Sequence, residues 1–272
     1  MNEEFDGTYG TPSSTAYANI NAYNQIFVDT VRQTGGNNAK RWLMIPGWNT
    51  NITYTVGNYG FSLPTDNYRD SSISTPRIMI SVHYYDPWDF CGEESSNVTQ
   101  WGDTATNSSK ISSWGDESAL KSQFSSLYNK FVAACYLVVI GEYGSIDKSA
   151  YDSTSAAQRA EFAKKVCTYA KKYGMVPVLW DNGYTGTYGF GVIDRSTCKV
   201  TQQKIIDAIA SVYPKSSSSN SSNSSASSLE GTYYIKSSFS GLYLDVANGS
   251  ASNNANVQQY TYTGTDRQKF KL

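Results

Sequence analysis

The sequence is poor in the residues that build metal centres, with a single histidine, His83, and four cysteines among 272 residues. The cysteines are widely and irregularly spaced and match no zinc pattern, and a lone histidine argues against a histidine-based site. No metal and no cofactor is therefore predicted. Spacing alone does not distinguish disulfides from free buried thiols, so both states stay open for Cys91, Cys135, Cys167 and Cys198.

Charge of either sign is also scarce. Only 17% of the residues are charged, and 22 Lys and Arg nearly balance 23 Asp and Glu, for a net charge of −1. Proteins that bind nucleic acids or anionic membranes usually carry blocks of Lys and Arg, which this chain lacks. Neither partner is predicted. The sequence shows no stretch long and apolar enough to span a bilayer, and no signal peptide.

Aromatic residues, in contrast, are abundant: 14% of the chain, including 22 Tyr and 6 Trp. Flat, neutral ligands such as sugars stack on aromatic rings, although core packing uses the same residues. The composition alone is therefore only a weak indication of a sugar ligand.

Apolar patterns predict an alternation of strands and helices. Continuous apolar runs predict strands at 41–47, 76–85, 136–142 and 175–181, and helical periodicity predicts helices at 17–33, 116–134, 155–173 and 201–213. In the first helix, Ile20, Asn24, Phe27 and Val31 are expected on the inward face. Uniformly apolar strands that alternate with helices are typical of a parallel sheet covered by helices, an α/β fold.

The chain changes character after Tyr213. Residues 214–229 are rich in Ser and Asn and predict a flexible linker between a domain at 1–213 and a second one at 230–272. The second segment alternates Tyr and Val with turn residues, which predicts short strands. A segment this short buries little core by itself, so it is expected to be part of something larger.

Polar or aromatic residues stand where several strands are expected to end. They are Asn2 and Glu3, His83 and Tyr85, Glu142, and Trp180. In a β/α barrel all such strand ends lie on one face, and that face holds the active site. Glu3 and Glu142 are then candidates for the two carboxylates of a glycosidase. Taken singly, Glu3 is more typical of a frayed terminal residue and His83 of a satisfied core histidine, and a core position is the alternative for Trp180. Their common placement at strand ends favours a site.

Four segments in order resemble the motifs of glycoside hydrolase family five, the clan-A cellulase barrels. They are "MNEE" (1–4), "SVHYYDPW" (81–88), "VVIGEYG" (138–144) and "VPVLWDNG" (176–183), and "PGWNTN" (46–51) is similar to the segment that ends the fifth barrel strand. The resemblance covers residues 1–213. It implies an incomplete TIM (β/α)8 barrel, running from the end of the fourth strand to the eighth helix.

The resemblance also implies a role for each matching residue. Glu3 is implied as acid/base and Glu142 as nucleophile, and Asn2 as a ligand of the sugar 2-hydroxyl. His83 and Tyr85 are implied to position Glu142, Trp180 to lie beneath the sugar, and Trp48 and Trp88 to add stacking surface.

Two departures from the family pattern affect this prediction. Glu4 stands where the family usually has proline, and the earlier barrel strands have no counterpart in this sequence. We therefore expect Met1 to be an internal methionine or the edge of an incomplete gene, and this chain alone to be unstable or inactive, because half a barrel has open edges.

The C-terminal segment resembles one repeat of a ricin-type β-trefoil, a carbohydrate-binding module. "SGLYLDV", "NVQQY" and "RQKF" carry the resemblance, with Gln-Lys-Phe in place of Gln-x-Trp. It implies that Asp245 binds sugar hydroxyls, that Tyr260 stacks on the sugar, and that Gln268 supports the loop of Asp245. The alternative is an ordinary fragment of a β domain.

The resulting prediction is a retaining endo-β-1,4-glucanase that is monomeric when complete and secreted. Its substrate would be a β-glycan polysaccharide such as cellulose, mixed-linkage β-glucan, xyloglucan or mannan. A non-catalytic carbohydrate-binding protein is the alternative from another class, and the pair of glutamates argues against it. Transglycosylation uses the same intermediate and is not distinguishable by sequence.

Overall fold

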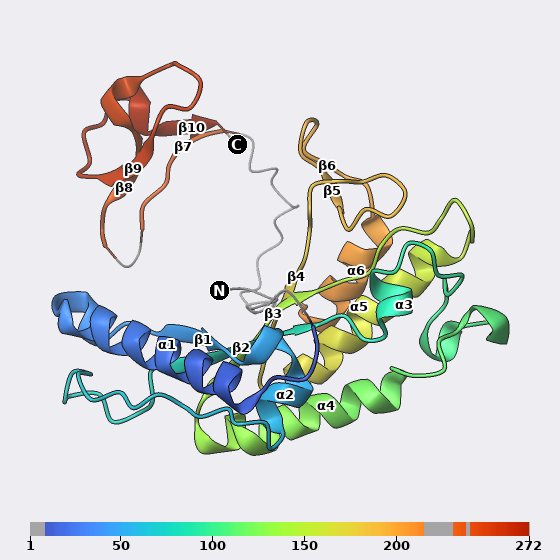
Figure 1. The fold of residues 1–272 in the computed structure, drawn as a ribbon. Helices are drawn as coiled ribbons and strands as arrows, with labels where there is room; N and C mark the ends of the chain where they lie inside the picture. Colours follow the sequence, from blue (N-terminus) through green and yellow to red (C-terminus); the bar gives the residue numbers. More distant parts are fainter. Residues whose placement is uncertain (1–8, 215–230, 238–239, 272) are drawn as a thin grey trace, which may run out of the picture. The chain divides into compact units, whose positions relative to one another are not determined.

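The computed structural model describes residues 9–214, 231–237 and 240–271, and the chain divides into two compact units, Met1–Lys215 and Ser216–Leu272 (Figure 1). Asn2 and Glu3 lie outside the described residues, as does nearly all of the predicted linker.

The first unit contains helices α1 (Ser14–Gln33), α2 (Ile52–Val56), α3 (Trp88–Cys91), α4 (Glu117–Lys130), α5 (Ser155–Lys172) and α6 (Gln203–Val212). Its strands are β1 (Leu43–Pro46), β2 (Ile78–Tyr84), β3 (Leu137–Tyr143), β4 (Val176–Leu179) and the hairpin β5 (Ile193–Asp194) and β6 (Lys199–Val200). Every helix and strand predicted from the sequence is present. Sequence patterns missed α2, α3 and the hairpin, which are too short to show periodicity.

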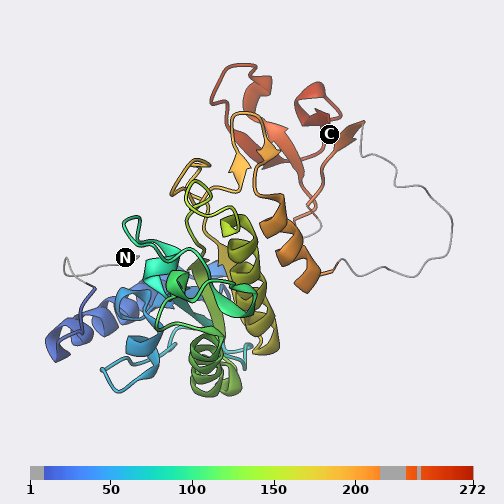
Figure 2. The same cartoon turned by 90° about the vertical axis from the view of Figure 1, so that its right-hand side faces the viewer.

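Strands β1 to β4 form one parallel sheet in the order β1-β2-β3-β4. Helices α1, α4, α5 and α6 lie along one side of it (Figures 1 and 2). The predicted α/β arrangement with a parallel sheet is thus confirmed. Because parallel strands all point the same way, their carboxyl ends meet at one edge of the sheet.

Side chains alternate between the two faces of this sheet. Those that face the helices are buried and form the core, among them Ile45, Ile80, Val82, Val138 and Ile140. Residues between them in sequence point to the other face, where Met44 and Val178 are each 45% exposed. The helices therefore cover only one face of the sheet.

Helix α1 is turned slightly from its predicted orientation. Its buried residues are Tyr17, Ile20, Asn24, Val28 and Arg32, whereas Phe27, expected to face inward, is 42% exposed. The prediction for Phe27 was therefore wrong. Ile20 and Asn24 are buried as expected, but apolar periodicity missed the last turns of this face because it ends in a charged residue, Arg32.

Arg32, near the end of α1, is held by a buried ion pair with Asp66. Its Nε donates to Asp66 Oδ1 at 2.8 Å and its Nη2 to Oδ2 at 3.2 Å, and the Arg32 side chain has no exposed surface. Nη1 donates to the carbonyls of Asn38 and Arg41, both at 2.7 Å. A bidentate, fully hydrogen-bonded arginine of this kind joins α1 to the segments that flank β1.

The second unit has two antiparallel strand pairs. Strand β8 (Tyr243–Val246) pairs with β9 (Val257–Tyr260), and β7 (Thr232–Tyr234) pairs with β10 (Lys269–Lys271). The predicted short strands are thus present.

All four cysteines are free thiols: Cys91 and Cys167 are buried, and Cys135 and Cys198 are exposed. Among the described residues, the helices are all too short or too polar to cross a membrane.

Breaking the Arg32–Asp66 pair tests its contribution. Asp66→Ala leaves the guanidinium buried without its carboxylate, so we expect the free energy of unfolding to fall by about 3–5 kcal/mol. Urea unfolding followed by tryptophan fluorescence measures this for the first unit, because all 6 tryptophans precede residue 215.

Lys40→Ala is the control for this experiment. It breaks the pair between Lys40, whose side chain is 57% exposed, and Asp70. Exposed pairs contribute about 1 kcal/mol or less. Equal losses in the two variants would contradict a special role for the Arg32 pair.

Candidate active site

A cavity of about 590 Å³ opens at the carboxyl edge of the sheet. Apart from Tyr9, which precedes α1, its lining comes from the ends of the four strands and the loops that follow them: Asn49, Thr50, Asn51, His83, Tyr85, Asp86, Trp88, Glu142, Trp180 and Phe190. The volume is within the usual range for small-molecule sites. His83, Tyr85, Glu142, Trp180 and Trp88, which the sequence singled out, therefore lie in one site.

Glu142 reaches this cavity because β3 carries one extra residue. Val82 pairs with Ile140, but the next residue of β2, His83, pairs with Glu142, so Gly141 has no partner on β2. Pairing with β4 shifts in the same stretch of β3. An extra residue reverses the alternation of side chains. After buried Val138 and Ile140, the next buried residue is Tyr143, and Glu142 turns to the face that carries His83.

Glycine at 141 is required by its neighbours on β2. A β-carbon at this position would lie 2.9 Å from Ser81 Oγ and 3.3 Å from His83 Nε2. Only the absence of a side chain lets the imidazole lie this close to the backbone next to Glu142. The position of Glu142 therefore depends on glycine as the residue before it.

Two side chains from β2 and its end hold the Glu142 carboxylate. Tyr85 donates its hydroxyl to Oε2 at 2.9 Å, and His83 Nδ1 lies 3.3 Å from the same oxygen. Within the described part of the chain nothing donates to the other oxygen, Oε1. The Glu142 side chain is 15% exposed. Its orientation is thus fixed while one oxygen stays available in the cavity.

Aromatic rings form much of the remaining wall. Tyr85 meets Trp88 and Phe190 edge to face, with ring centroids 6.2 and 5.8 Å apart. Trp88 and Trp180 keep 49% and 40% of their surface exposed. Since a half-exposed ring that lines a cavity offers a face to a flat ligand, both rings are available for the stacking that the sequence resemblance implies.

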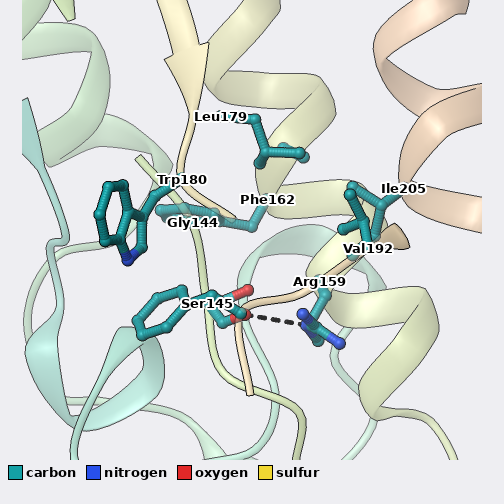
Figure 3. Close-up of a pocket in the computed structure, with 10 residues that line it drawn as sticks. Gly144, Ser145, Arg159, Phe162, Leu179, Trp180, Val192 and Ile205 are labelled. Carbon is teal, nitrogen blue, oxygen red and sulfur yellow. Dashed lines mark hydrogen bonds between the residues drawn. The ribbon is translucent and has the colours of Figure 1, made fainter. Parts of the chain in front are cut away.

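A much smaller cavity, of about 10 Å³, is lined by Trp180, Phe162 and Arg159, among others (Figure 3). It has room for about one water molecule, so it is no sugar site. The buried Arg159 lines it, donating to the carbonyls of Ser145 at 2.9 Å and Gly189 at 3.4 Å. Arg159 thereby joins the loop after β3 to the loop that carries Phe190.

A buried lysine joins the same loop after β3 to the loop after β2. The Lys148 ammonium donates to the carbonyls of Asp89, Ser96 and Val98 at 2.9, 3.2 and 2.9 Å. Burial lowers the pKa of Lys148. Four residues on, Asp152 accepts hydrogen bonds from Thr99, Gln100 and Lys110 of the long loop. The loop at 86–115 is therefore tightly anchored beside the cavity.

Trp48 does not contribute the stacking surface expected of it. Its ring is 2% exposed, packs on Tyr17, and donates Nε1 to the carbonyl of Gly10 at 3.1 Å. The structure places it in the core because it turns away from the cavity that Asn49, Thr50 and Asn51 line.

The sequence did not point to every lining residue. Asp86 follows β2 directly, so the rule that strand ends form the site applied to it as well. Phe190 lies in a glycine-rich loop far beyond β4. A β-carbon at Gly189 would lie 2.0 Å from the carbonyl oxygen of Tyr184, which shows how tightly this loop folds back. No sequence pattern signals that contact.

The three module residues lie together in the second unit. Asp245 is fully buried; its Oδ1 accepts from Gln258 at 3.1 Å and its Oδ2 lies 3.0 Å from Arg267 Nε. The Arg267 guanidinium lies 5.3 Å from the ring centre of Tyr260, which is 47% exposed. Gln268, also buried, bonds the backbone of Thr261 and Thr263. A sugar that reached Asp245 would have to displace Arg267.

Comparison with known families identifies both units. Residues 1–186 match the family model described as cellulase, glycosyl hydrolase family 5. Residues 223–272 match the model described as ricin-type beta-trefoil lectin domain-like. Among curated proteins, the chain is 63% identical over 211 residues to endoglucanase A of Paenibacillus barcinonensis, covering 77% of this chain and 53% of that protein. It is 33% identical to a xyloglucan-specific endo-beta-1,4-glucanase of Bacteroides ovatus, covering 71% of this chain and 37% of that protein.

Solved structures agree with these matches. A family 5 xyloglucanase from Paenibacillus pabuli, in complex with ligand, is 65% identical with a TM-score of 0.76, covering 78% of this chain and 60% of that one. A broad specificity endoglucanase from Bacteroides salanitronis is 36% identical with a TM-score of 0.69, covering 79% and 56%. The chain spans about half the length of the curated relatives it matches, or less.

The requirement for glycine at position 141 is testable. Gly141→Ala forces a methyl group against Ser81 and His83, and we expect the free energy of unfolding to fall by about 1–3 kcal/mol. Ser81→Ala removes the nearest atom, so the same change should cost less in that background. Urea unfolding of the four combinations measures the coupling. Strict additivity would show that the contact with Ser81 carries no strain.

Proposed function

Because the chain belongs to glycosyl hydrolase family 5, we propose that it is an endo-acting β-1,4-glucanase that cleaves with retention of configuration. The observation that carries the proposal is the Glu142 carboxylate, held at Oε2 by Tyr85 and His83 and presented in a cavity walled by aromatic rings. Neutral sugars suit such a cavity, because rings contact their apolar faces and carboxylates accept from their hydroxyls.

In the proposed reaction Glu142 attacks the anomeric carbon as the glycosidic bond breaks. Glu3, which lies outside the described residues, gives its proton to the leaving oxygen. Glu3 then takes a proton from water, whose oxygen attacks the anomeric carbon and releases Glu142. Asn2 is proposed to bond the sugar 2-hydroxyl. His83 and Tyr85 keep the Glu142 carboxylate aimed at the anomeric carbon throughout.

The proposed substrate is a soluble or hydrated β-1,4-glucan chain. An open cavity at the edge of the sheet suits an internal segment of a polymer, and Trp180 and Trp88 supply a ring near Glu142 on each side. Xyloglucan is included, because a structure 65% identical to this chain is described as a xyloglucanase. An extracellular location is proposed with this substrate, since a cell-wall polysaccharide does not enter cells. We also propose that the complete protein is a monomer.

For the second unit we propose a supporting role in carbohydrate binding. The exposed face of Tyr260 supports it, together with the match of this segment to the ricin-type lectin model. Asp245 would contribute after Arg267 has moved, with Gln268 holding the adjacent backbone.

Removal of the nucleophile tests the reaction. Glu142→Gln should lower hydrolysis of carboxymethylcellulose and xyloglucan about a thousandfold or more, because the neutral amide does not attack. Tyr85→Phe should lower it roughly ten- to a hundredfold, since it removes one hydrogen bond to a charged group. Tyr23→Phe, on the exposed side of α1 and 56% exposed, is the control and should have no effect.

Release of reducing ends measures these rates in two proteins. One is the chain itself, and the other is a chimera in which this chain replaces the matching segment of endoglucanase A from Paenibacillus barcinonensis. Activity that survives Glu142→Gln in both proteins would refute the assignment of the nucleophile. Absence of activity in both would refute the glucanase and favour a carbohydrate-binding protein.

Binding by the second unit is tested separately, in the Glu142→Gln chain so that no substrate is consumed. Tyr260→Ala should weaken retention on insoluble polysaccharide about tenfold, as expected for loss of one aromatic contact. Val257→Ala, at an exposed position of β9, is the control. Equal retention of both variants would count against a role for Tyr260.

A further inference from the structure

Asp86 is a second carboxylate that lines the cavity besides Glu142, and the proposed reaction does not use it. It directly follows β2 and lines the cavity together with Glu142 and Trp88. The side chain is half-buried. A carboxylate in this position loses part of its hydration, and burial accordingly raises the pKa of Asp86. Such a group needs hydrogen-bond donors.

Only one of the two carboxylate oxygens of Asp86 has a donor. Gln123, on α4, donates Nε2 to Oδ2 at 2.8 Å. Among the described residues no group donates to Oδ1, and this oxygen is not closed off from solvent. Gln123 therefore fixes the direction of the carboxylate and leaves Oδ1 as a ready acceptor.

The backbone around Asp86 is held firmly. The amides of Phe90 and Cys91 donate to the carbonyl of the next residue, Pro87, at 3.1 and 2.9 Å. Gly115 packs so closely on Pro87 that a β-carbon there would lie 2.8 Å from the ring. A carboxylate on a rigid support binds a ligand without a large loss of conformational entropy.

The sheet order places this acceptor relative to the nucleophile. Glu142 ends β3, Trp180 follows β4 on one side, and Asp86 and Trp88 follow β2 on the other. A linear chain that crosses the sheet edge through Glu142 would therefore have Trp180 on one side and Asp86 with Trp88 on the other.

We propose that Asp86 is a substrate-binding residue that accepts hydrogen bonds from the hydroxyl groups of a sugar unit on the β2 side of Glu142, with Trp88 against the apolar face of that unit. The ligand class is a neutral β-1,4-linked glucose chain. The proposal rests on the proposed function and adds to it a residue that discriminates between sugars by their hydroxyl groups. A ligand without a hydroxyl group at this position would leave the Asp86 oxygen without a hydrogen-bond donor and would therefore bind more weakly.

The test measures binding of cellohexaose to the full chain carrying Glu142→Gln, by isothermal titration calorimetry. In that background Asp86→Asn keeps an oxygen for Gln123 but replaces the open oxygen with an NH₂ group. We expect it to weaken binding roughly ten- to a hundredfold. Asp86→Ala should weaken binding at least as much.

Asp103→Asn is the matched control, because Asp103 lies in the same loop with its side chain 83% exposed and does not line the cavity. It changes the net charge equally and should leave the affinity unchanged. Thermal unfolding of each variant shows whether the fold is kept. Asp86→Asn tests the role even if Asp86→Ala does not fold.

The outcomes separate the two proposals. If the Glu142→Gln chain binds cellohexaose and Asp86→Asn binds it equally well, the role of Asp86 is refuted and the glucanase proposal stands. If Asp103→Asn weakens binding as much as Asp86→Asn, the effect is one of net charge and the role is refuted too. If the parent chain binds no β-glucan, the same titrations are made in the second protein described above, which combines this chain with its Paenibacillus barcinonensis relative. Absence of binding there too refutes the proposed function, and the role of Asp86 fails with it.

Discussion

The site depends on one unpaired residue in one strand. If β3 were regularly paired through Gly141, strict alternation would direct Glu142 toward the helices, into the layer that holds Val138 and Ile140. A charged carboxylate in that layer would be expensive to bury. The register shift turns it toward the cavity instead, opposite His83 and within reach of Tyr85. The other residues that line the cavity surround the Glu142 carboxylate only because this shift turns it toward them.

Much of the fold was predictable because local patterns and tertiary structure agree. Each parallel strand of the sheet appears in the sequence as an apolar run, and α4 and α5 show clear periodicity. The rule that strand ends gather at one edge also located His83, Tyr85, Glu142 and Trp180. Topology places these residues at the carboxyl edge, but the face to which Glu142 turns depends on the register shift at Gly141.

The remaining features depend on contacts that no local pattern records. Trp48 and Trp88 both follow strands, yet Trp48 is buried and only Trp88 lines the cavity. Arg32 lies on the buried face of α1 because Asp66, distant in sequence, completes its hydrogen bonds. In the second unit, the motif singled out Asp245 and Tyr260 but did not indicate that Arg267 contacts both. In each case a partner remote in sequence decides the environment.

The anchoring of the long loop by Lys148 has a consequence for the way proteins with this fold diverge. The lysine belongs to the loop after β3, but all three carbonyls it binds belong to the loop after β2. Exchanging one of these loops for that of a relative would leave either the buried Lys148 ammonium without acceptors or the three carbonyls without a donor. Recombination and loop grafting should therefore succeed only when residues 86–115 and 144–154 are transferred together. The two segments are expected to change together in evolution, although α4 and β3 separate them in the sequence.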